Sequence, residues 1–354
     1  MIPISKYVKI DELSNLPKEK FRIIDVRSPA EFEEDHILGS ENFPVLDDHE
    51  RKNVGILYKQ DTFEAKRLGA RIISTNISKI LEKIENTEIN YKQMGLRKPD
   101  TSFLIYCWRG GMRSTSLFTV MDLIGYKSYV LDGGYKSYRN WVNNYISKYS
   151  FPDLYVVHGP SGTGKTKILK LLKKEGFPIL NLEEIANHNG SVFGSLSRNQ
   201  PSQKLFESIL AENLKKLKSS PLIILEGESR KIGKNSLPNH LYNSIQSAKK
   251  IWIELPLKER AEALSQEYKF SESEFLEKLN YIKKYMKSDV IIKIKNCFNN
   301  GDYFETAHLL LKYHYDNLYF KSFKYSNHEM DYHINENSFE QLYEKLRNYI
   351  KGLI

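Results

Sequence analysis

Cysteine is scarce in this chain of 354 residues, because only Cys107 and Cys297 occur. Two cysteines cannot staple a chain of this size, and neither lies in a CxxC or Cys/His pattern with metal-ligand spacing. The scarcity excludes a disulfide-rich scaffold, and the sequence predicts no structural metal. We therefore expect a protein of a reducing compartment.

Long hydrophobic runs are also lacking. No apolar stretch is long enough to cross a bilayer, and residues 1–20 have neither the apolar core nor the small-residue cleavage site of a signal peptide. Internal repeats and low-complexity segments are missing as well. With an ordinary hydrophobic content of 40%, the sequence predicts a globular cytoplasmic protein that does not insert into membranes.

Positive charge exceeds negative charge. The formal net charge is +9, from 53 lysines and arginines against 44 aspartates and glutamates. This balance favours a polyanionic partner such as a nucleic acid. Lysine, asparagine, isoleucine and tyrosine are all frequent, however, as a compositional bias of the genome would also produce. The charge alone leaves the partner open.

The first part of the chain alternates short apolar runs with helical patterns, which is typical of a mostly parallel α/β sheet. The charged stretch 46–75 is expected to be a partly helical elaboration of this sheet. Buried strands are predicted at 21–26, 101–107 and 128–134, with a helix capped by Ser28 after the first and a helix over 113–126 after the second.

A second unit is predicted after a transition marked by Pro152. From about residue 257 onward the pattern is helical and rich in lysine. We therefore predict two α/β domains, one over 1–145 and one over 150–354. The strands of the second sheet are expected at 154–159, 221–229 and 249–255, with a helix over 164–176 after the first of them.

The stretch YCWRGGMRS at 106–114 places Cys107 at the end of a predicted strand, before a loop with two glycines and a helix. Backbone N–H groups converge in such a turn, and Arg109 and Arg113 lie nearby in sequence. A nest of this kind favours the thiolate and holds an anion against the sulfur. An isolated cysteine is more often structural, but this context favours a catalytic role for Cys107, Arg109 and Arg113.

The stretch GPSGTGKT at 159–166 matches the pattern G-x-x-x-x-G-K-[ST] in full, between a predicted strand and a predicted helix. Loop N–H groups and the helix N-terminus are expected to hold a diphosphate, Lys165 to neutralise it and Thr166 to offer a ligand to Mg²⁺. The pattern does not define what the diphosphate is attached to. The predicted phosphate-binding residues are Gly159, Ser161, Gly162, Gly164, Lys165 and Thr166.

Two acidic residues follow the predicted strand of the stretch LIILEGES. Glu226 or Glu228 could hold Mg²⁺ or act as a base, although solvated acids at an ordinary strand end would look the same. His188, in a glycine-rich turn, is a candidate substrate contact, but a histidine in a turn is more often only a polar surface residue.

Several basic stretches are candidates for binding RNA. Lysines interleave with tyrosines over 278–288, where unpaired bases could stack on the rings, and KIKN at 293–296 continues this pattern. A solvated amphipathic helix explains these lysines equally well. A second candidate is RKIGK at 230–234, close to the phosphate loop. The candidate residues are Arg230, Lys231, Lys283, Lys284 and Tyr285.

Residues 1–145 resemble the rhodanese family of sulfurtransferases. The resemblance is carried by the Cys107 loop, by IIDVRSPAEFEEDHILGSENFPV at 23–45 and by LDGGYKSYRNW at 131–141. It implies that Cys107 carries sulfur or selenium, whereas Asp25 and Arg27 hold the fold. The loop is one residue longer than in plain sulfurtransferases and matches dual-specificity phosphatases. Phosphatase chemistry usually requires a carboxylic acid that protonates the leaving group, and no residue stands out for that role.

The chain as a whole resembles the family of bacterial tRNA 2-selenouridine synthases. The family joins a rhodanese-like domain to a P-loop domain with a helical C-terminal region. Besides both loops, the resemblance is carried by ERKNVGILYKQ (50–60), DGGYKSYR (132–139), ANHNGSVFGS (186–195), QPSQKLFE (200–207), EGESRKIG (226–233) and HYD (314–316).

This resemblance implies a transferase that acts on a 5-substituted 2-thiouridine at the wobble position of tRNA. The C2 sulfur is first geranylated from geranyl diphosphate, and selenium from selenophosphate then displaces geranylthiol. The P-loop would hold the departing diphosphate, Mg²⁺ is a possible cofactor, and Cys107 would serve the selenium step. Contact with a selenophosphate synthase is a further possible partnership.

Two rival interpretations remain at this point. An ATP-dependent sulfurtransferase or kinase acting on RNA would hydrolyse nucleotide and need no isoprenoid diphosphate. An RNA-binding or regulatory protein would have degenerate sites, against which the intact Cys107, Lys165 and Thr166 argue.

Overall fold

The structure is a computed structural model and describes residues 6–15, 21–93, 102–188, 199–227, 229–266, 271–325 and 330–354. The chain forms two compact units. The first consists of residues 1–145 and 202–211, and the second of residues 146–201 and 212–354. Residues 202–211, which the sequence placed within the second domain, thus belong to the first unit.

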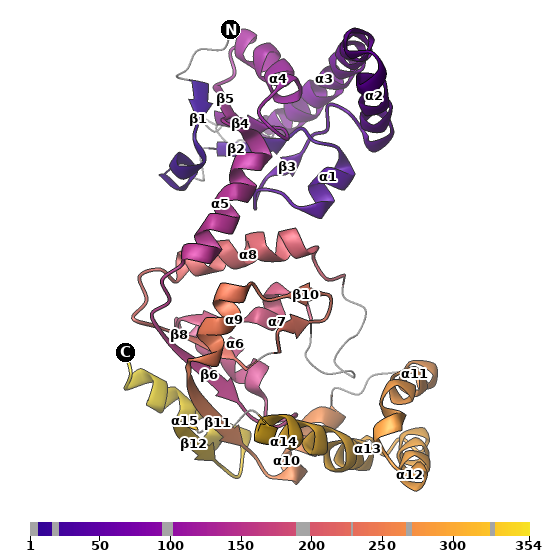
Figure 1. Cartoon of the computed structure of the whole chain (residues 1–354), viewed down its shortest axis with the longest axis vertical. Helices are drawn as coiled ribbons and strands as arrows, with labels where there is room; N and C mark the ends of the chain where they lie inside the picture. The colour runs from indigo at the N-terminus through magenta and orange to yellow at the C-terminus, as the bar shows by residue number, and fades with distance from the viewer. Residues whose placement is uncertain are drawn as a thin grey trace. The chain divides into compact units, whose positions relative to one another are not determined.

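The first unit is built on a parallel sheet of five strands in the order β1-β5-β4-β2-β3 (Figure 1). Parallel strands need crossover connections, and helices supply them. The elements are β1 (Tyr7–Val8), η2 (Ile10–Asn15), β2 (Phe21–Asp25), α1 (Pro29–Glu34), β3 (Glu41–Asn42), α2 (Asp48–Gln60), α3 (Thr62–Gln93), β4 (Ser102–Tyr106), α4 (Met112–Leu123), β5 (Ser128–Leu131) and α5 (Gly134–Lys148).

The predicted strands and helices of this unit are confirmed to within a few residues. β2, β4 and β5 occupy the predicted segments, and Ser28 caps α1 in a capping box with Glu31. The stretch 46–75, expected to be a partly helical elaboration of the sheet, forms α2 and the first part of α3. The long helix α3 buries Ile73, Ile77 and Ile84 beside α4 against the sheet.

The second unit has its own parallel sheet, in the order β12-β11-β6-β8-β7 (Figure 1). The elements that follow α5 in the chain are β6 (Asp153–His158), α6 (Lys165–Lys174), β7 (Ile179–Leu180), α7 (Leu182–Ile185), α8 (Gln203–Lys216), β8 (Leu222–Glu226), β9 (Lys231–Ile232), β10 (Asn235–Ser236), α9 (Asn239–Gln246), β11 (Lys249–Glu254), α10 (Leu257–Ser265), α11 (Glu272–Ile282), η4 (Lys283–Tyr285), α12 (Ser288–Asn299), α13 (Tyr303–Leu310), η5 (Leu311–Tyr315), α14 (Asp316–Tyr325), β12 (Tyr332–Asn335) and α15 (Phe339–Lys351). All of them belong to the second unit except the first part of α8, which belongs to the first.

Helices α6 and α15 pack on the sheet of the second unit and bury Leu169, Leu172 and Leu346 there. Helices α10 to α13 form a separate helical core around Phe275, Leu279 and further apolar residues. The expectation of a wholly helical region after residue 257 was wrong at one place, because β12 pairs in parallel with β11. Only four residues long and half polar, β12 lacks the apolar run that predicts a buried strand.

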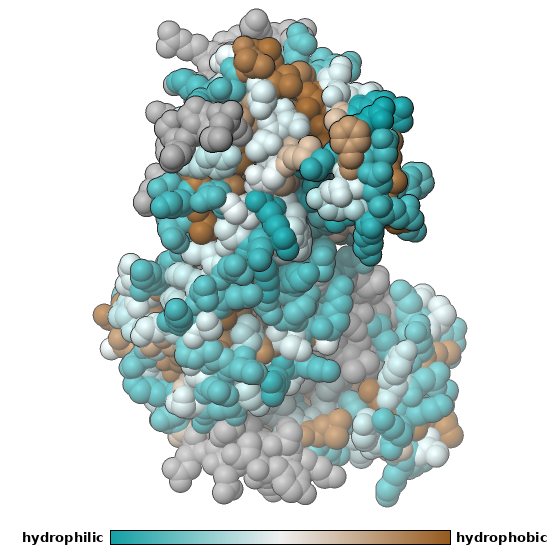
Figure 2. All heavy atoms as spheres, turned by 45° about the horizontal axis from the view of Figure 1, so that its top comes forward, coloured by the Kyte–Doolittle hydropathy of each residue, from teal (hydrophilic) through white to brown (hydrophobic). Residues whose placement is uncertain are grey.

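The α/β fold class predicted from the sequence is confirmed in both units. In the described part of the chain, no helix combines the length and the apolar character that crossing a membrane requires. Hydrophilic residues cover most of the face drawn in Figure 2, with scattered hydrophobic patches between them. In each unit the candidate loop follows the carboxyl end of a parallel strand, where ligands of open α/β sheets bind.

Candidate functional site

Cys107 directly follows β4 and is almost fully buried, with 3% of its surface exposed. The loop behind it turns at Gly110, whose φ is 69°, and α4 begins at Met112. The amides at the start of a helix are available to an anion because they have no partner within the helix. The strand–loop–helix arrangement predicted for the Cys107 loop is therefore present.

A hydroxyl group holds the sulfur of Cys107. The Ser114 Oγ lies 3.2 Å from the Cys107 Sγ and 3.0 Å from the carbonyl oxygen of Gly111, and its one hydrogen can be donated to either of them. Ser114 is fully buried. The hydroxyl group of Ser114 therefore positions the sulfur at the start of α4.

The N-terminus of α5 also contacts the Cys107 loop, called the thiol loop below. The amide of Tyr135 donates to the carbonyl oxygen of Cys107 at 2.8 Å, and the amide of Lys136 donates to that of Trp108 at 3.0 Å. The Gly-Gly turn that leads into α5 has positive φ at Gly133 and at Gly134, the first residue of the helix. Two separate elements, α4 and α5, thus fix the loop.

The two arginines predicted at the loop stand in different surroundings. Arg113 Nη1 donates to Glu31 Oε2 at 2.7 Å, and Arg51 lies 3.6 Å from the same oxygen. Burial raises the pKa of Glu31, but the hydrogen bond and charge of Arg113 outweigh it, so the pKa lies below its ordinary value. Arg109 is exposed to solvent on the loop.

Asp25 and Arg27 form a buried ion pair, as the resemblance to rhodaneses implied. Arg27 Nη2 donates to Asp25 Oδ2 at 2.6 Å and to the carbonyl oxygen of Asp35, also at 2.6 Å. Both side chains are nearly inaccessible, with 0% and 1% of their surface exposed. The pair ties the end of β2 to the C-terminal end of α1 and is shielded from solvent.

The phosphate loop of the second unit connects β6 to α6. Gly162 and Gly164 have φ values of 84° and 78°, which favour glycine, and a Cβ at Gly159 would lie 2.3 Å from the carbonyl oxygen of Ile253. The glycines of the pattern are therefore required by the backbone. Ser161 lies between them in the same loop, and its carbonyl oxygen accepts from Arg260 Nη1 at 3.0 Å.

Lys165 and Thr166 open α6. Lys165 Nζ donates to the carbonyl oxygens of Gly159 at 2.7 Å and Pro160 at 3.3 Å, so the ammonium group lies over its own loop. Thr166 Oγ1 lies 3.0 Å from Glu183 Oε2 and 3.0 Å from Glu226 Oε2. The loop thus presents a cation, a hydroxyl group and two carboxylates at the N-terminus of one helix.

Burial raises the pKa of Glu226 to about 7, the charge of Lys165 opposes this, and the charge of Glu183 adds to it. Glu183 and Glu226 have 6% and 3% of their surface exposed. A hydroxyl and two carboxylates are the oxygen ligands that Mg²⁺ prefers. These residues fit a divalent cation, which would also remove the proton that Glu226 holds near neutral pH.

The sequence predicts only part of this site. Glu183 was missed, because it stands on the short helix α7 and a pair of acids such as Glu183-Glu184 is common on surfaces. Arg260, Asp316 and Tyr319 were also missed. Asp316 lies within the stretch HYD that supported the family resemblance, which was the available signal.

These three missed residues brace the phosphate loop from behind. Arg260 Nη1 and Nη2 donate to the two carboxylate oxygens of Asp316, both at 2.8 Å. The hydroxyl oxygen of Tyr319 accepts from the amide of Gly159 at 2.9 Å, and its ring lies 5.9 Å from Lys165 Nζ. Helices α10 and α14 therefore hold the conformation of the loop.

The remaining predicted residues lie apart from these two loops or outside the described residues. Arg230 and Lys231 are exposed, the latter on β9, and Arg230 Nη2 donates to Asn239 Oδ1 at 2.6 Å. Lys283, Lys284 and Tyr285 are exposed and make up η4. Glu228 lies outside the described residues, as does most of the stretch at 186–195. His188 is described, and its amide donates to the carbonyl oxygen of Glu183 at 3.0 Å.

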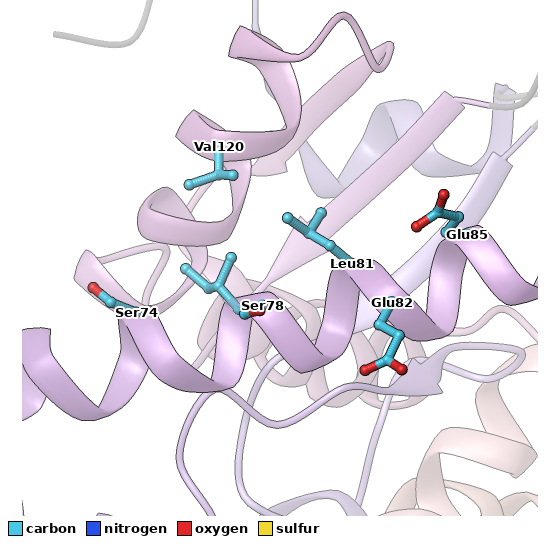
Figure 3. Close-up of a pocket in the computed structure, with 7 residues that line it drawn as sticks. Ser74, Ser78, Leu81, Glu82, Glu85 and Val120 are labelled. Carbon is cyan, nitrogen blue, oxygen red and sulfur yellow. The ribbon is translucent and has the colours of Figure 1, made fainter.

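A groove of about 560 Å³ lies in the first unit between α3 and α4. Leu81 and Val120 approach each other across it, and Ser74, Ser78, Glu82 and Glu85 line it along α3 (Figure 3). Among the described residues, the lining includes two carboxylates, Glu82 and Glu85, and no lysine or arginine. Such a lining would repel a diphosphate or RNA, because both are anions. The two loops therefore remain the candidate sites.

The fold and its two loops define a class of protein in which a rhodanese-like unit and a P-loop unit share one chain. Residues 9–140 match the rhodanese-like domain, and residues 152–290 match the tRNA 2-selenouridine synthase AAA domain.

Similar proteins match most of the length of this chain. Proteins named tRNA 2-selenouridine synthase from Nitrosomonas europaea and Bdellovibrio bacteriovorus are each 35% identical to this chain. The matches cover 74% of this chain in both cases, and 67% and 68% of the respective relatives. The protein of that name from Shewanella frigidimarina is 33% identical over 75% of this chain and 70% of its own length. The chain belongs to the tRNA 2-selenouridine synthase family.

Proposed function

We propose that this protein is a transferase that replaces the C2 sulfur of a 5-substituted 2-thiouridine in tRNA by selenium. The observation that carries the proposal is family membership combined with two intact loops, because neither the Cys107 loop nor the phosphate loop has lost a residue that its chemistry needs. An RNA-binding protein with degenerate sites would have no use for either arrangement.

The phosphate loop serves the first step, geranyl transfer. The thiocarbonyl sulfur forms a bond to C1 of geranyl diphosphate while the bond from C1 to the diphosphate oxygen breaks. The diphosphate leaves with the electron pair, and N3 of the base loses its proton to solvent. Lys165 and the loop amides stabilise this leaving group. Thr166, Glu183 and Glu226 are positioned to hold Mg²⁺, which would neutralise further negative charge when bound.

The thiol loop serves the second step. The S-geranyl group makes C2 of the base electrophilic; selenium from selenophosphate bonds to C2, and the C2–S bond breaks to release geranylthiol. Water takes over the phosphoryl group as the P–Se bond breaks. Cys107, with the hydroxyl group of Ser114 at its sulfur and α4 opening beside it, holds the selenium donor for this displacement.

The phosphatase alternative is weakened by the surroundings of Arg113. A general acid must hold a proton near the working pH. Glu31, the carboxyl group paired with Arg113, has a lowered pKa and is therefore ionised. The spacing shared with phosphatases is thus better explained by an enlarged loop that accepts a phosphate-bearing selenium donor such as selenophosphate.

Nucleoside mass spectrometry on a purified reaction tests the proposal. The full chain is incubated with tRNA that contains 2-thiouridine, Mg²⁺ and geranyl diphosphate, with or without selenophosphate. We expect S-geranyl-2-thiouridine without selenophosphate and 2-selenouridine with it. If modification of the tRNA required ATP and did not require geranyl diphosphate, the result would instead support an ATP-dependent sulfurtransferase.

A further inference from the structure

The helical part of the second unit carries a strong local excess of positive charge. Residues 278–295 contain six lysines and one aspartate, a net charge of +5. Lys283 and Lys284 are exposed, and so are Tyr281 and Tyr285, with 66% and 53% of their surface accessible. Large aromatic rings on a charged surface are costly to expose and commonly mark a binding site.

A second segment, distant in sequence, also exposes a lysine next to a tyrosine. Lys312 and Tyr313 are exposed within η5, a single π-helical turn between α13 and α14. Such turns occur frequently at functional sites because they interrupt the regular helix. Lys312 Nζ lies 5.4 Å from the Tyr313 ring, and Lys284 Nζ lies 4.9 Å from the Tyr285 ring.

The two segments meet at a buried histidine. The ring of His314 lies 5.8 Å from the ring of Tyr285, and only 4% of its surface is exposed. Burial lowers the pKa of His314, so the imidazole is neutral and adds no charge of its own. His314 therefore joins η4 to η5 as a packing contact and leaves the lysines and tyrosines on the outside.

The surface is linked to the phosphate loop through α14. Asp316 follows η5 directly and pairs with Arg260, which donates to the carbonyl oxygen of Ser161. Tyr319, one helical turn further along, accepts from the amide of Gly159. A molecule bound over Tyr313 and Tyr285 would thus rest on the same helical segment that braces the diphosphate site.

We propose that Lys284, Tyr285, Lys312 and Tyr313 form a surface that binds an unpaired strand of the tRNA substrate. The proposal rests on the proposed function and specifies the element that holds the RNA. Lysines neutralise phosphates, while tyrosine rings stack on bases that are free of a duplex. Neither an acidic peptide nor a duplex would make use of both features.

Fluorescence anisotropy with a labelled tRNA transcript that has uridine at the wobble position tests this surface in the full chain. Tyr285→Ala is expected to raise the Kd at least about fivefold, the loss of one base–ring stack, while Tyr285→Phe keeps the ring and the affinity. Lys284→Ala combined with Lys312→Ala is expected to reduce the slope of log K against log[salt] by about 1.4.

Phe63→Ala combined with Arg67→Ala is the matched control. These residues form an exposed cation–ring pair on α3, with the guanidinium 5.9 Å from the ring, and 68% of Phe63 is accessible. We expect the control to bind tRNA as the wild type does. Binding of pyrophosphate, measured by thermal shift, is the check that every variant retains its phosphate loop.

The outcomes separate this proposal from the proposed function. Wild-type protein that fails to bind tRNA would contradict the proposed function itself. If the wild type binds tRNA, and Tyr285→Ala and the double lysine variant bind it with the same Kd, only the proposed surface is overturned. A competition experiment gives a further test. If polyglutamate or duplex RNA displaced the labelled tRNA as effectively as single-stranded RNA does, the proposed surface would also be overturned, because it would then bind anions without recognising unpaired bases.

Discussion

Gly134 packs directly against the backbone of Cys107. A Cβ atom at position 134 would lie 2.3 Å from the carbonyl oxygen of Cys107 and 2.6 Å from the amide nitrogen of Gly110. The φ of Gly134 is 58°, a value that disfavours residues with a side chain. The first residue of α5 therefore helps to fix the position of the thiol, although it has no side chain.

Gly134→Ala is accordingly expected to displace the thiol loop. Gly125→Ala is the matched control, because Gly125 also has a positive φ, 91°, but nothing lies within 4 Å of its added Cβ. The control should cost about 1–2 kcal/mol of unfolding free energy from backbone strain alone. We expect Gly134→Ala to cost more and to lower the rate of selenation at least tenfold, while geranylation continues. Denaturant unfolding and nucleoside analysis measure the two effects, and equal behaviour of the two variants would contradict this account.

Lys165→Ala tests the phosphate loop. Removing the ammonium group takes away the charge that stabilises the departing diphosphate, so kcat/KM for geranyl transfer should fall about 100-fold or more. Lys174→Ala, at the exposed end of the same helix, should retain wild-type kinetics. Steady-state geranylation assays measure both variants. If Lys165→Ala kept the wild-type kcat/KM, the diphosphate would have to bind elsewhere.

Glu226 makes the stability of the protein depend on pH. Burial raises the pKa of this carboxyl group to about 7 in the folded protein, whereas an unfolded chain releases the proton near pH 4.3. Between these values the folded state holds more protons than the unfolded state, so the free energy of unfolding falls as the pH rises. The loss is complete above about pH 7.

Glu226→Gln cannot ionise and should escape this loss, which is about 2–3 kcal/mol between pH 5 and pH 8. Urea unfolding of both proteins at the two pH values measures it, with the exposed Glu184→Gln as control. Mg²⁺ should stabilise the wild type more at pH 8 than at pH 6, because the metal displaces the proton. A stability difference between wild type and Glu226→Gln that does not change with pH would refute the assignment.

The ion pair between Arg260 and Asp316 is predicted to stabilise the second unit. Their side chains are only 5% and 16% exposed, so Asp316→Ala leaves a nearly buried guanidinium without its carboxylate. Such a loss costs about 3–5 kcal/mol. The exposed pair of Lys249 and Asp153, broken by Asp153→Ala, should cost at most about 1 kcal/mol. If both variants had similar midpoints of urea unfolding, the Arg260–Asp316 ion pair would contribute little to the stability of the second unit.

Much of the fold could be predicted from the sequence because local signals agreed with the tertiary arrangement. Apolar runs such as 21–26 and 221–229 are typical of the buried strands of a parallel sheet, and Ser28 with Glu31 supplies a capping box at α1. The role of α3 could not be predicted, because its apolar residues are widely spaced among charged ones and only packing against the sheet reveals which face is buried.

The candidate site was predictable where a few consecutive residues form it. The Cys107 loop and the stretch 159–166 are local, so their sequence determines their geometry. Glu183, Arg260 and Tyr319 reach the phosphate loop from elements up to 160 residues away. No spacing within the sequence relates them to Lys165, and only the fold of the second unit brings them together.

In the proposed function, the two loops serve consecutive steps of one reaction. Nucleoside mass spectrometry of tRNA from cells that lack their own enzyme and produce either the wild type or Cys107→Ser tests it most directly. The account predicts 2-selenouridine with the wild type, and with the variant an accumulation of S-geranyl-2-thiouridine without selenouridine. Undiminished 2-selenouridine in the variant would contradict the role of Cys107, and the absence of both nucleosides from wild-type cells would contradict the proposed function.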